Sequence, residues 1–89
     1  WSRIRETHPG AILYPTMGGG GPHTDIRERY AHIEELADAG ALGMAIIDPG
    51  TVNLAPAGAD GLPLPIDLVY QNTHADVRAM IDVCRARDL

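Results

Sequence analysis

Lysine is absent from this chain of 89 residues, and cysteine occurs once, as Cys84. Without lysine, Schiff-base chemistry and the lysine-dependent phosphate-binding loop are excluded. A single cysteine cannot form an internal disulfide, so the chain is not a disulfide-stabilised secreted scaffold, and one unpaired thiol suits a reducing compartment. We therefore expect a cytoplasmic protein whose stability comes from its apolar core.

Positive charge and long apolar runs are also scarce. Seven arginines stand against twelve acidic residues, which gives a formal net charge of −5. This balance argues against binding of a nucleic-acid backbone. No apolar run approaches the ~20 residues of a membrane-spanning helix, and the N-terminus lacks the apolar middle of a signal peptide. We expect neither nucleic acid nor membrane as a partner, and the initial tryptophan in place of methionine predicts a processed or excerpted piece.

Two short, continuous apolar runs, at residues 11–14 and 42–47, are typical of strands that are buried on both faces. A helix end is predicted before the turn at 9–10, and a third extended piece is predicted at 68–70. That piece follows a long loop at 54–66, whose prolines and glycines forbid regular structure. Loops of this length are usually functional or mobile.

Helical spacing of apolar residues predicts two helices. Thr24 is the candidate N-cap of the first helix, and Gly40 is placed to end it. Thr73 is the candidate N-cap of the second, where Asp76 completes a capping-box pattern. The apolar stripes of the two helices are predicted to be Ile26, Tyr30, Ile33 and Ala37, and Val77, Met80, Ile81 and Cys84.

The order strand, helix, strand, helix predicts an α/β fold with parallel strands joined by a right-handed crossover. Parallel strands need cover on both faces, and two helices cannot supply it. The βαβα unit over residues 1–89 is therefore expected to be a partial domain, part of a larger barrel or sheet. Its missing neighbours would come from the remainder of that fold or from another copy of the chain.

Polar, turn-prone residues follow both predicted strands at their carboxyl ends, where α/β proteins place their sites. After the first strand, Thr16 can donate its hydroxyl to a bound carboxylate or to its own backbone. The glycines at 18–21 can expose N–H groups to an anion or form a flexible turn. After the second strand, Asp48 can orient a substrate, act as a base or shape a turn. Asn53 and Asn72 leave the same choice between ligand contact and hydrogen bonding within a loop.

No metal site is expected from these residues alone. The four histidines form neither a His-x-His nor a His-x-x-x-His pair, and three convergent ligands are lacking. His23, beside the glycines, is the histidine best placed to contact a ligand, whereas His32 is expected in solvent. Cys84 lies on a predicted buried stripe, where a thiol behaves as a small hydrophobe rather than as a nucleophile.

Four stretches in order carry a resemblance to a known family: ILYPTMGGG at 12–20, ER at 28–29, AIIDPGTVNL at 45–54 and VYQNT at 69–73. Together they resemble the β-keto acid cleavage enzyme family. The resemblance covers nearly the whole chain but only about a third of a family member. It implies a (β/α)₈ TIM barrel of ~250 residues or more, of which 1–89 would be about strand 3 to helix 4. It also implies a zinc-dependent, usually homo-oligomeric enzyme that condenses a β-keto acid with acetyl-CoA to give acetoacetate and a CoA thioester.

The resemblance also implies roles for individual residues. In the family a Ser or Thr followed by glycines helps to hold the keto acid, which implies substrate binding by Thr16, Gly18 and Gly19. A Thr-x-Gly-Ser-x-Asn pattern after the next strand corresponds to DPGTVN in this chain. This second match implies substrate binding by Thr51 and Asn53.

Asp48 stands where that pattern has its first Thr, a departure that indicates a different keto acid. As a catalytic residue, Asp48 would orient a group of the substrate rather than transfer a proton. The family's zinc ligands are a His-x-His on an earlier strand and a Glu on a later one. Neither has a match here, so no metal ligand is assigned, and the isolated segment is expected to be inactive.

A hypothesis from another class is a non-catalytic βαβα module that completes its sheet by self-association and binds a small anion through its glycines. A different phosphate-binding barrel stays open on the same glycines, although the absence of lysine weighs against it. A well-folded monomer or dimer in sedimentation would favour the module, and an aggregated or molten chain would favour the barrel segment.

Overall fold

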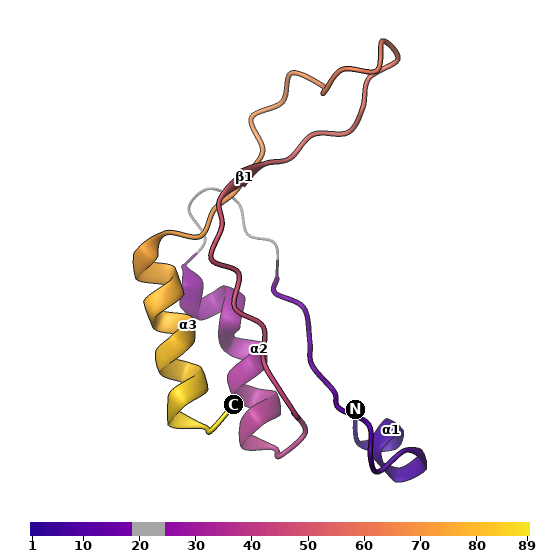
Figure 1. Cartoon of the computed structure of the whole chain (residues 1–89), viewed down its shortest axis with the longest axis vertical. Helices are drawn as coiled ribbons and strands as arrows, with labels where there is room; N and C mark the ends of the chain where they lie inside the picture. The colour runs from indigo at the N-terminus through magenta and orange to yellow at the C-terminus, as the bar shows by residue number, and fades with distance from the viewer. Residues whose placement is uncertain (19–24) are drawn as a thin grey trace.

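The computed structural model describes residues 1–18 and 25–89, in which three helices and two short strands are joined by long extended stretches (Figure 1). The helices are α1 (Ser2–Thr7), α2 (Ile26–Asp38) and α3 (His74–Ala86), and the strands are β1 (Val52–Asn53) and β2 (Val69–Tyr70). Helices α2 and α3 begin at the same end of the molecule and lie side by side. Helix α1 confirms the helix predicted before the turn at 9–10.

The helix boundaries are set by capping residues at or next to those predicted. Asp25 is the N-cap of α2, and its Oδ1 accepts the backbone N–H two positions further on at 2.9 Å. The predicted cap, Thr24, lies outside the described residues. Gly40 follows the C-cap of α2 with φ +65°, as predicted. The capping box of α3 is confirmed, because Thr73 and Asp76 each accept the other's backbone N–H, at 3.1 and 2.8 Å.

The apolar core lies between α2 and α3 and the extended chain that follows α2. Its buried members are Tyr30, Ile33, Leu42, Met80 and Cys84. The predicted stripes are confirmed except at Ile81, which is half-buried and lies outside this cluster, whereas Val83 packs against it. Cys84 is buried, as expected for a thiol that serves as a small hydrophobe.

Tyr30 links this core to the extended chain. Its hydroxyl donates to the carbonyl of Ile46 at 2.8 Å and lies 3.3 Å from Cys84 Sγ. Burial, and then the hydrogen bond with Cys84, raises the pKa of the Tyr30 phenol above its ordinary value. The protonated hydroxyl therefore remains a donor, and it keeps the chain around Ile46 against the helix pair.

The two segments predicted as strands, 11–14 and 42–47, lie next to each other without forming a ladder. They run in the same direction along α2 (Figure 1), and Gly43 N–H donates to Leu13 O at 3.0 Å, the single backbone hydrogen bond between them in the described residues. A Cβ at Gly43 would lie 3.1 Å from the side chain of Ile12, so glycine permits this close approach. A parallel ladder requires a run of evenly spaced bonds, so this pair is adjacent extended chain rather than sheet.

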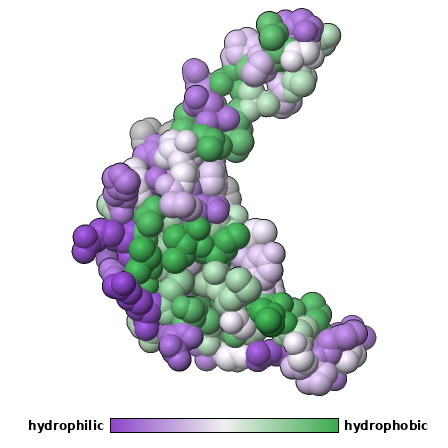
Figure 2. Space-filling model, in the orientation of Figure 1, coloured by the Kyte–Doolittle hydropathy of each residue, from purple (hydrophilic) through white to green (hydrophobic). Residues whose placement is uncertain are grey.

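The first of these segments is covered on one face. Burial alternates along residues 11–18, where Met17 packs on the core and Thr16 is exposed. Ile12 is 69% exposed and Tyr14 is 51% exposed. The sequence predicted strands that need cover on both faces, which two helices cannot supply; in the structure α2 covers one face of this segment, and no other described element covers the second. Figure 2 shows the resulting band of apolar side chains across the middle of the molecule.

Residues 54–68, the arm, project away from the helices (Figure 1). The base of the arm is the antiparallel pairing of β1 with β2, in which Val52 lies opposite Tyr70 and Asn53 opposite Val69. The projecting arm explains why the radius of gyration is 16.0 Å, whereas a compact chain of this length would have about 12 Å.

The loop predicted at 54–66 lies within the arm and has the contacts of a loose hairpin. Leu54 N–H donates to Leu68 O at 2.8 Å, and Ala57 and Pro63 form an isolated antiparallel bridge. Ladder bonds are few because proline has no N–H to donate. The proline content therefore prevents regular strands here, as expected, without preventing the two halves of the arm from pairing.

The arm is apolar although it is exposed. Its only charged residues are Asp60 and Asp67. The exposed large hydrophobic residues of the arm and of its base are Val52, Leu54, Leu62, Leu64, Ile66 and Leu68. Continuous apolar exposure of this kind marks a contact surface in soluble proteins. In the part of the chain that the structure describes, no helix is long and apolar enough to cross a membrane.

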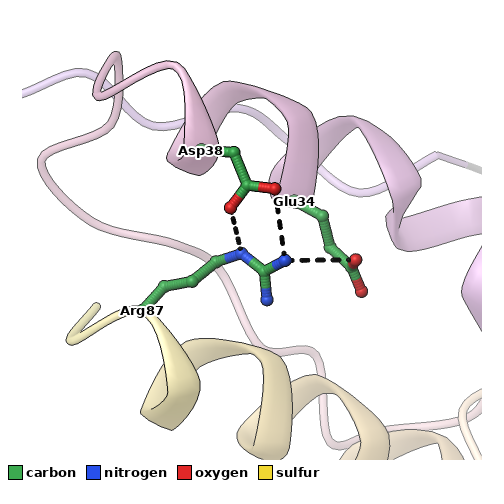
Figure 3. Close-up of polar contacts among 3 residues, drawn as sticks. All are labelled: Glu34, Asp38 and Arg87. Atoms are coloured by element: carbon green, nitrogen blue, oxygen red, sulfur yellow. Dashed lines mark hydrogen bonds and ion pairs between the residues drawn. The ribbon is translucent and has the colours of Figure 1, made fainter.

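Arg87, just after α3, ties the end of this helix to α2 (Figure 3). Its Nε donates to Asp38 Oδ1 at 2.8 Å, and its Nη2 lies 3.3 Å from Glu34 Oε2. The hydrogen bond to Asp38 is the main reason that the pKa of the Arg87 guanidinium lies above its ordinary value. Arg87 is half-buried, but both carboxylates are well exposed to solvent, so the contribution of the cluster to stability is small.

Replacing Arg87 by Met should lower the free energy of unfolding slightly, because two carboxylates on α2 lose their shared cation. Salt screens exposed charges, so the difference from wild type should shrink as the salt concentration rises. Urea denaturation at low and high salt measures both effects. A loss of stability that is the same at every salt concentration would show that Arg87 acts through packing instead.

Replacing Leu42 by Ala should lower the free energy of unfolding by about 2–5 kcal/mol, because Leu42 belongs to the buried cluster. The same change at Leu62, which is 63% exposed on the arm, should lower it by less than about 0.5 kcal/mol. Urea denaturation compares the two variants. Equal losses would contradict the placement of the core between the helices.

Candidate functional site

The carboxyl ends of the two extended segments lie at one end of the helix pair, beside the first turns of α2 and α3 and the base of the arm (Figure 1). Thr16 and Gly18 come from the first segment, and Asp48 and Thr51 from the second. The Arg29 side chain of α2 hydrogen-bonds to the first segment, and the side chains of Tyr70 and Asn72 hydrogen-bond to the second. The predicted site residues that the structure describes thus lie at the same end of the helix pair.

Asp48 is held by Tyr70, whose hydroxyl donates to Asp48 Oδ2 at 2.6 Å. Burial, and then the hydrogen bond to Asp48, raises the pKa of the Tyr70 phenol above its ordinary value. The phenol therefore stays protonated and continues to donate at neutral pH. Asp48 is half-buried, and its carboxylate is fixed by a side chain from β2 rather than by the turn that follows it.

Thr51 and Asn72 hold each other. Thr51 Oγ1 donates to the Asn72 carbonyl at 3.1 Å and accepts the Asn72 N–H at 3.0 Å. The Asn72 side chain, 4% exposed, donates from Nδ2 to the Gly50 carbonyl at 2.9 Å. The sequence left ligand contact and hydrogen bonding within a loop open for Asn72, and the structure shows Asn72 hydrogen-bonded within the chain. The hydroxyl of Thr51 is engaged in the same contact, which fixes the turn at 50–51.

Thr16 and Gly18 are bound to α2 through their backbone carbonyls. His32 Nε2 lies 2.9 Å from Thr16 O, and Arg29 Nε donates to Gly18 O at 3.3 Å. His32 was expected in solvent and instead makes this contact. The Thr16 side chain is exposed, and its hydroxyl has no hydrogen-bond partner among the described residues. Thr16 is therefore positioned by its backbone carbonyl, and its side chain is exposed.

Three predicted positions contribute less to this arrangement. Gly19 and His23 lie outside the described residues. Asn53 is exposed in β1, opposite Val69 at the base of the arm. Its predicted contact with substrate remains a prediction.

Arg29, like Tyr70, has a place in this arrangement that was not predicted from the sequence. Only 7% exposed, it donates from Nη1 to Gln71 O at 2.7 Å and from Nη2 to Asn72 Oδ1 at 2.8 Å. Its Cζ lies 5.2 Å from the centroid of the Tyr70 ring. The sequence does indicate that Arg29 is buried, because position 29 follows Ile26 by three residues and so falls on the apolar face of the helix.

The described residues do not form a zinc site. No group of three or more His, Cys, Asp or Glu side chains among them could hold a metal ion. The rings of His8 and His32 are bound to the Thr7 hydroxyl and the Thr16 carbonyl. The described residues therefore do not complete a zinc site by themselves.

Polar side chains gathered where extended segments end, beside helix N-termini, are typical of the substrate sites of α/β enzymes. Comparison with protein families gives the family: a family model described as beta-keto acid cleavage enzyme matches residues 1–89. The chain belongs to this family, and the resemblance drawn from its four sequence stretches is confirmed. Neither the curated proteins nor the solved structures include a match to the chain.

Replacing Asp48 by Asn should lower the pKa of Tyr70, because the carboxylate favours the protonated phenol by accepting its hydrogen bond and by its negative charge. Titration of ¹³Cζ-labelled tyrosine by NMR measures this pKa. The matched change of Asp82 to Asn, on an exposed position of α3, should leave the titration of Tyr70 as in wild type. An unchanged Tyr70 titration in D48N would contradict the contact.

Proposed function

We propose that this protein is a zinc-dependent β-keto acid cleavage enzyme, which converts a β-keto acid and acetyl-CoA into acetoacetate and a new CoA thioester. In this reaction one carbon–carbon bond of the keto acid breaks, another forms to the acetyl group, and the CoA thiol passes to the new acyl group. The observation that carries the proposal is the family match over all 89 residues.

The geometry of the residues that follow the two extended segments supports a site for a keto acid. The exposed hydroxyl of Thr16 is a hydrogen-bond donor next to the glycines that start at Gly18. Such a donor can bind the carboxylate of the keto acid or stabilise negative charge that develops on its oxygen. The backbone N–H groups of Gly18 and Gly19, together with Thr51 and Asn53, are proposed to complete the binding of the substrate.

Asp48 is proposed to orient a group of the substrate. A carboxylate held by a hydrogen bond at 2.6 Å has a fixed direction, which is what an orienting role requires. Asp48 stands where many family members have Thr. The proposed keto acid therefore carries a hydrogen-bond donor whose hydrogen bond the Asp48 carboxylate accepts. Positioning of this kind lowers the barrier by holding reactants in a productive geometry.

The zinc dependence is proposed from membership of the family alone. Because the described residues do not fit the ion, its ligands would come from other parts of the polypeptide. The roles given to Thr16 and Asp48 therefore concern binding and orientation, and no step is assigned to the metal here.

The proposed fold is a βαβα segment of a (β/α)₈ barrel with parallel strands. Two observations support it: the extended segments run in the same direction along α2, and their second face is apolar and exposed. We propose that neighbouring strands of the barrel cover Ile12, Tyr14 and Met44. The apolar arm is proposed to contact the remainder of the barrel or another subunit of a homo-oligomer.

The protein expressed from its complete coding sequence and supplied with Zn²⁺ should form acetoacetate from acetyl-CoA and at least one member of a panel of β-keto acids. Replacing Thr16 by Val should reduce kcat/KM about 10- to 100-fold, the loss expected for one hydrogen bond to a charged group. Coupled detection of acetoacetate measures both results.

Thr7→Val is the matched control, because the Thr7 hydroxyl bonds within α1 and should leave kcat/KM unchanged. Absence of acetoacetate across the whole panel would contradict the proposed function. Equal activity of T16V and wild type would contradict the role of Thr16 while leaving the reaction in place.

A further inference from the structure

Arg29 carries a buried positive charge that the proposed reaction does not use. All three of its hydrogen-bond acceptors are neutral: the carbonyls of Gly18 and Gln71 and the side-chain oxygen of Asn72. No Asp or Glu oxygen lies within 4.0 Å of its nitrogens in the described residues. We propose that Arg29 is a positioning residue that fixes Asp48 through Tyr70 and Thr51 through Asn72. The kinetic part of its test rests on the proposed function.

Stability alone does not explain an arginine at this position. Taking a charge out of water is unfavourable, and an apolar side chain of similar volume is often at least as stabilising in a core. Ile26 and Ile33, one turn to either side on the same helix face, pack on the core as apolar residues do. A guanidinium differs from them in presenting several donors in a rigid, planar fork. At position 29 that fork reaches two separate segments of the chain.

The first link runs from Arg29 to Asp48. The guanidinium lies over the ring of Tyr70 at 5.2 Å, a cation–π contact that holds the ring in one plane. The hydroxyl of the same ring donates to Asp48 at 2.6 Å. The direction of the Asp48 carboxylate therefore depends on a ring that Arg29 holds.

The second link runs from Arg29 to Thr51. Nη2 donates to Asn72 Oδ1, which turns the amide so that Nδ2 faces the Gly50 carbonyl. The backbone of Asn72 then pairs with the Thr51 hydroxyl in both directions. A change in the Asn72 amide would therefore displace the turn that carries Thr51.

The third contact fixes the start of the glycine run, since Arg29 Nε donates to Gly18 O at 3.3 Å. One side chain of α2 thus sets three parts of the candidate site relative to each other. Misplacement of about 1 Å in such a site can reduce turnover about 100-fold. The expected signature of losing Arg29 is thus a loss of turnover rather than a loss of folding.

Arg29→Lys is the test variant, because it keeps the charge and the aliphatic stem but cannot reach three acceptors with one ammonium. Exchange of the Asn72 amide proton should become about tenfold faster or more, while exchange of the core amide of Met80 should stay as in wild type. In the acetoacetate assay, kcat should fall about 10- to 100-fold with KM little changed. Arg27→Lys is the matched control on the exposed face of α2 and should behave as wild type.

A double-mutant cycle tests the route through Tyr70. Tyr70→Phe keeps the ring under the guanidinium and removes the hydroxyl that holds Asp48. If Arg29 acts on Asp48 through this hydroxyl, R29K and Y70F should be strongly non-additive in kcat. Additive losses would overturn this link.

NMR on the unaltered protein keeps the inference testable if R29K fails to fold. Two η-nitrogens held by different acceptors should give separate resonances for Arg29, and one averaged resonance would overturn the proposal. Unchanged Asn72 exchange in R29K, or equal acceleration at Met80, would also overturn it. Absence of acetoacetate formation by wild type would refute the proposed function instead, and amide exchange would still decide the role of Arg29.

Discussion

The candidate site depends on the contacts that the buried guanidinium of Arg29 makes. The guanidinium hydrogen-bonds to the end of the first extended segment and to residues 71–72, and it stacks on the ring that holds Asp48. Each of these groups lies on chain without regular secondary structure or at the edge of a two-residue strand. Without a helical side chain to tie them, these segments would lose their relative positions. Because Arg29 is anchored on the rigid helix α2, it fixes the relative positions of these segments.

The helices could be predicted from the sequence because the signals that define them are local. Apolar spacing, the capping box at Thr73 and the glycine at position 40 each act within a few residues. The strands could not be predicted with the same success, because a strand is completed by neighbours that may be distant in the chain. Residues 11–14 and 42–47 are extended and adjacent, yet only one backbone hydrogen bond joins them in the described residues. The arm at 54–68 shows the same limit, since prolines predict the absence of regular structure but not the pairing of its two halves.

That Thr16 and Asp48 follow the two extended segments could be predicted from the sequence, but the contacts around them could not. Thr16 and Asp48 were identified because turn-prone polar residues follow apolar runs, and the family match supports the motifs around them. The partner of Asp48, Tyr70, lies 22 positions further along the chain and approaches it through the antiparallel base of the arm. Arg29 was missed because a charged residue in a helix is usually taken as solvent-facing. Its spacing from Ile26 placed it on the buried face, which is the signal that could have found it.

We propose that Thr16, Gly18 and Asp48 form one site for a β-keto acid, held together by Arg29. A crystal structure of the protein, expressed from its complete coding sequence and soaked with acetoacetate, tests this proposal most directly. We expect the acetoacetate carboxylate to lie within hydrogen-bond distance of the Thr16 hydroxyl, with Arg29 still bound to Gly18 and Asn72. Acetoacetate bound elsewhere, with this site empty, would contradict the proposal.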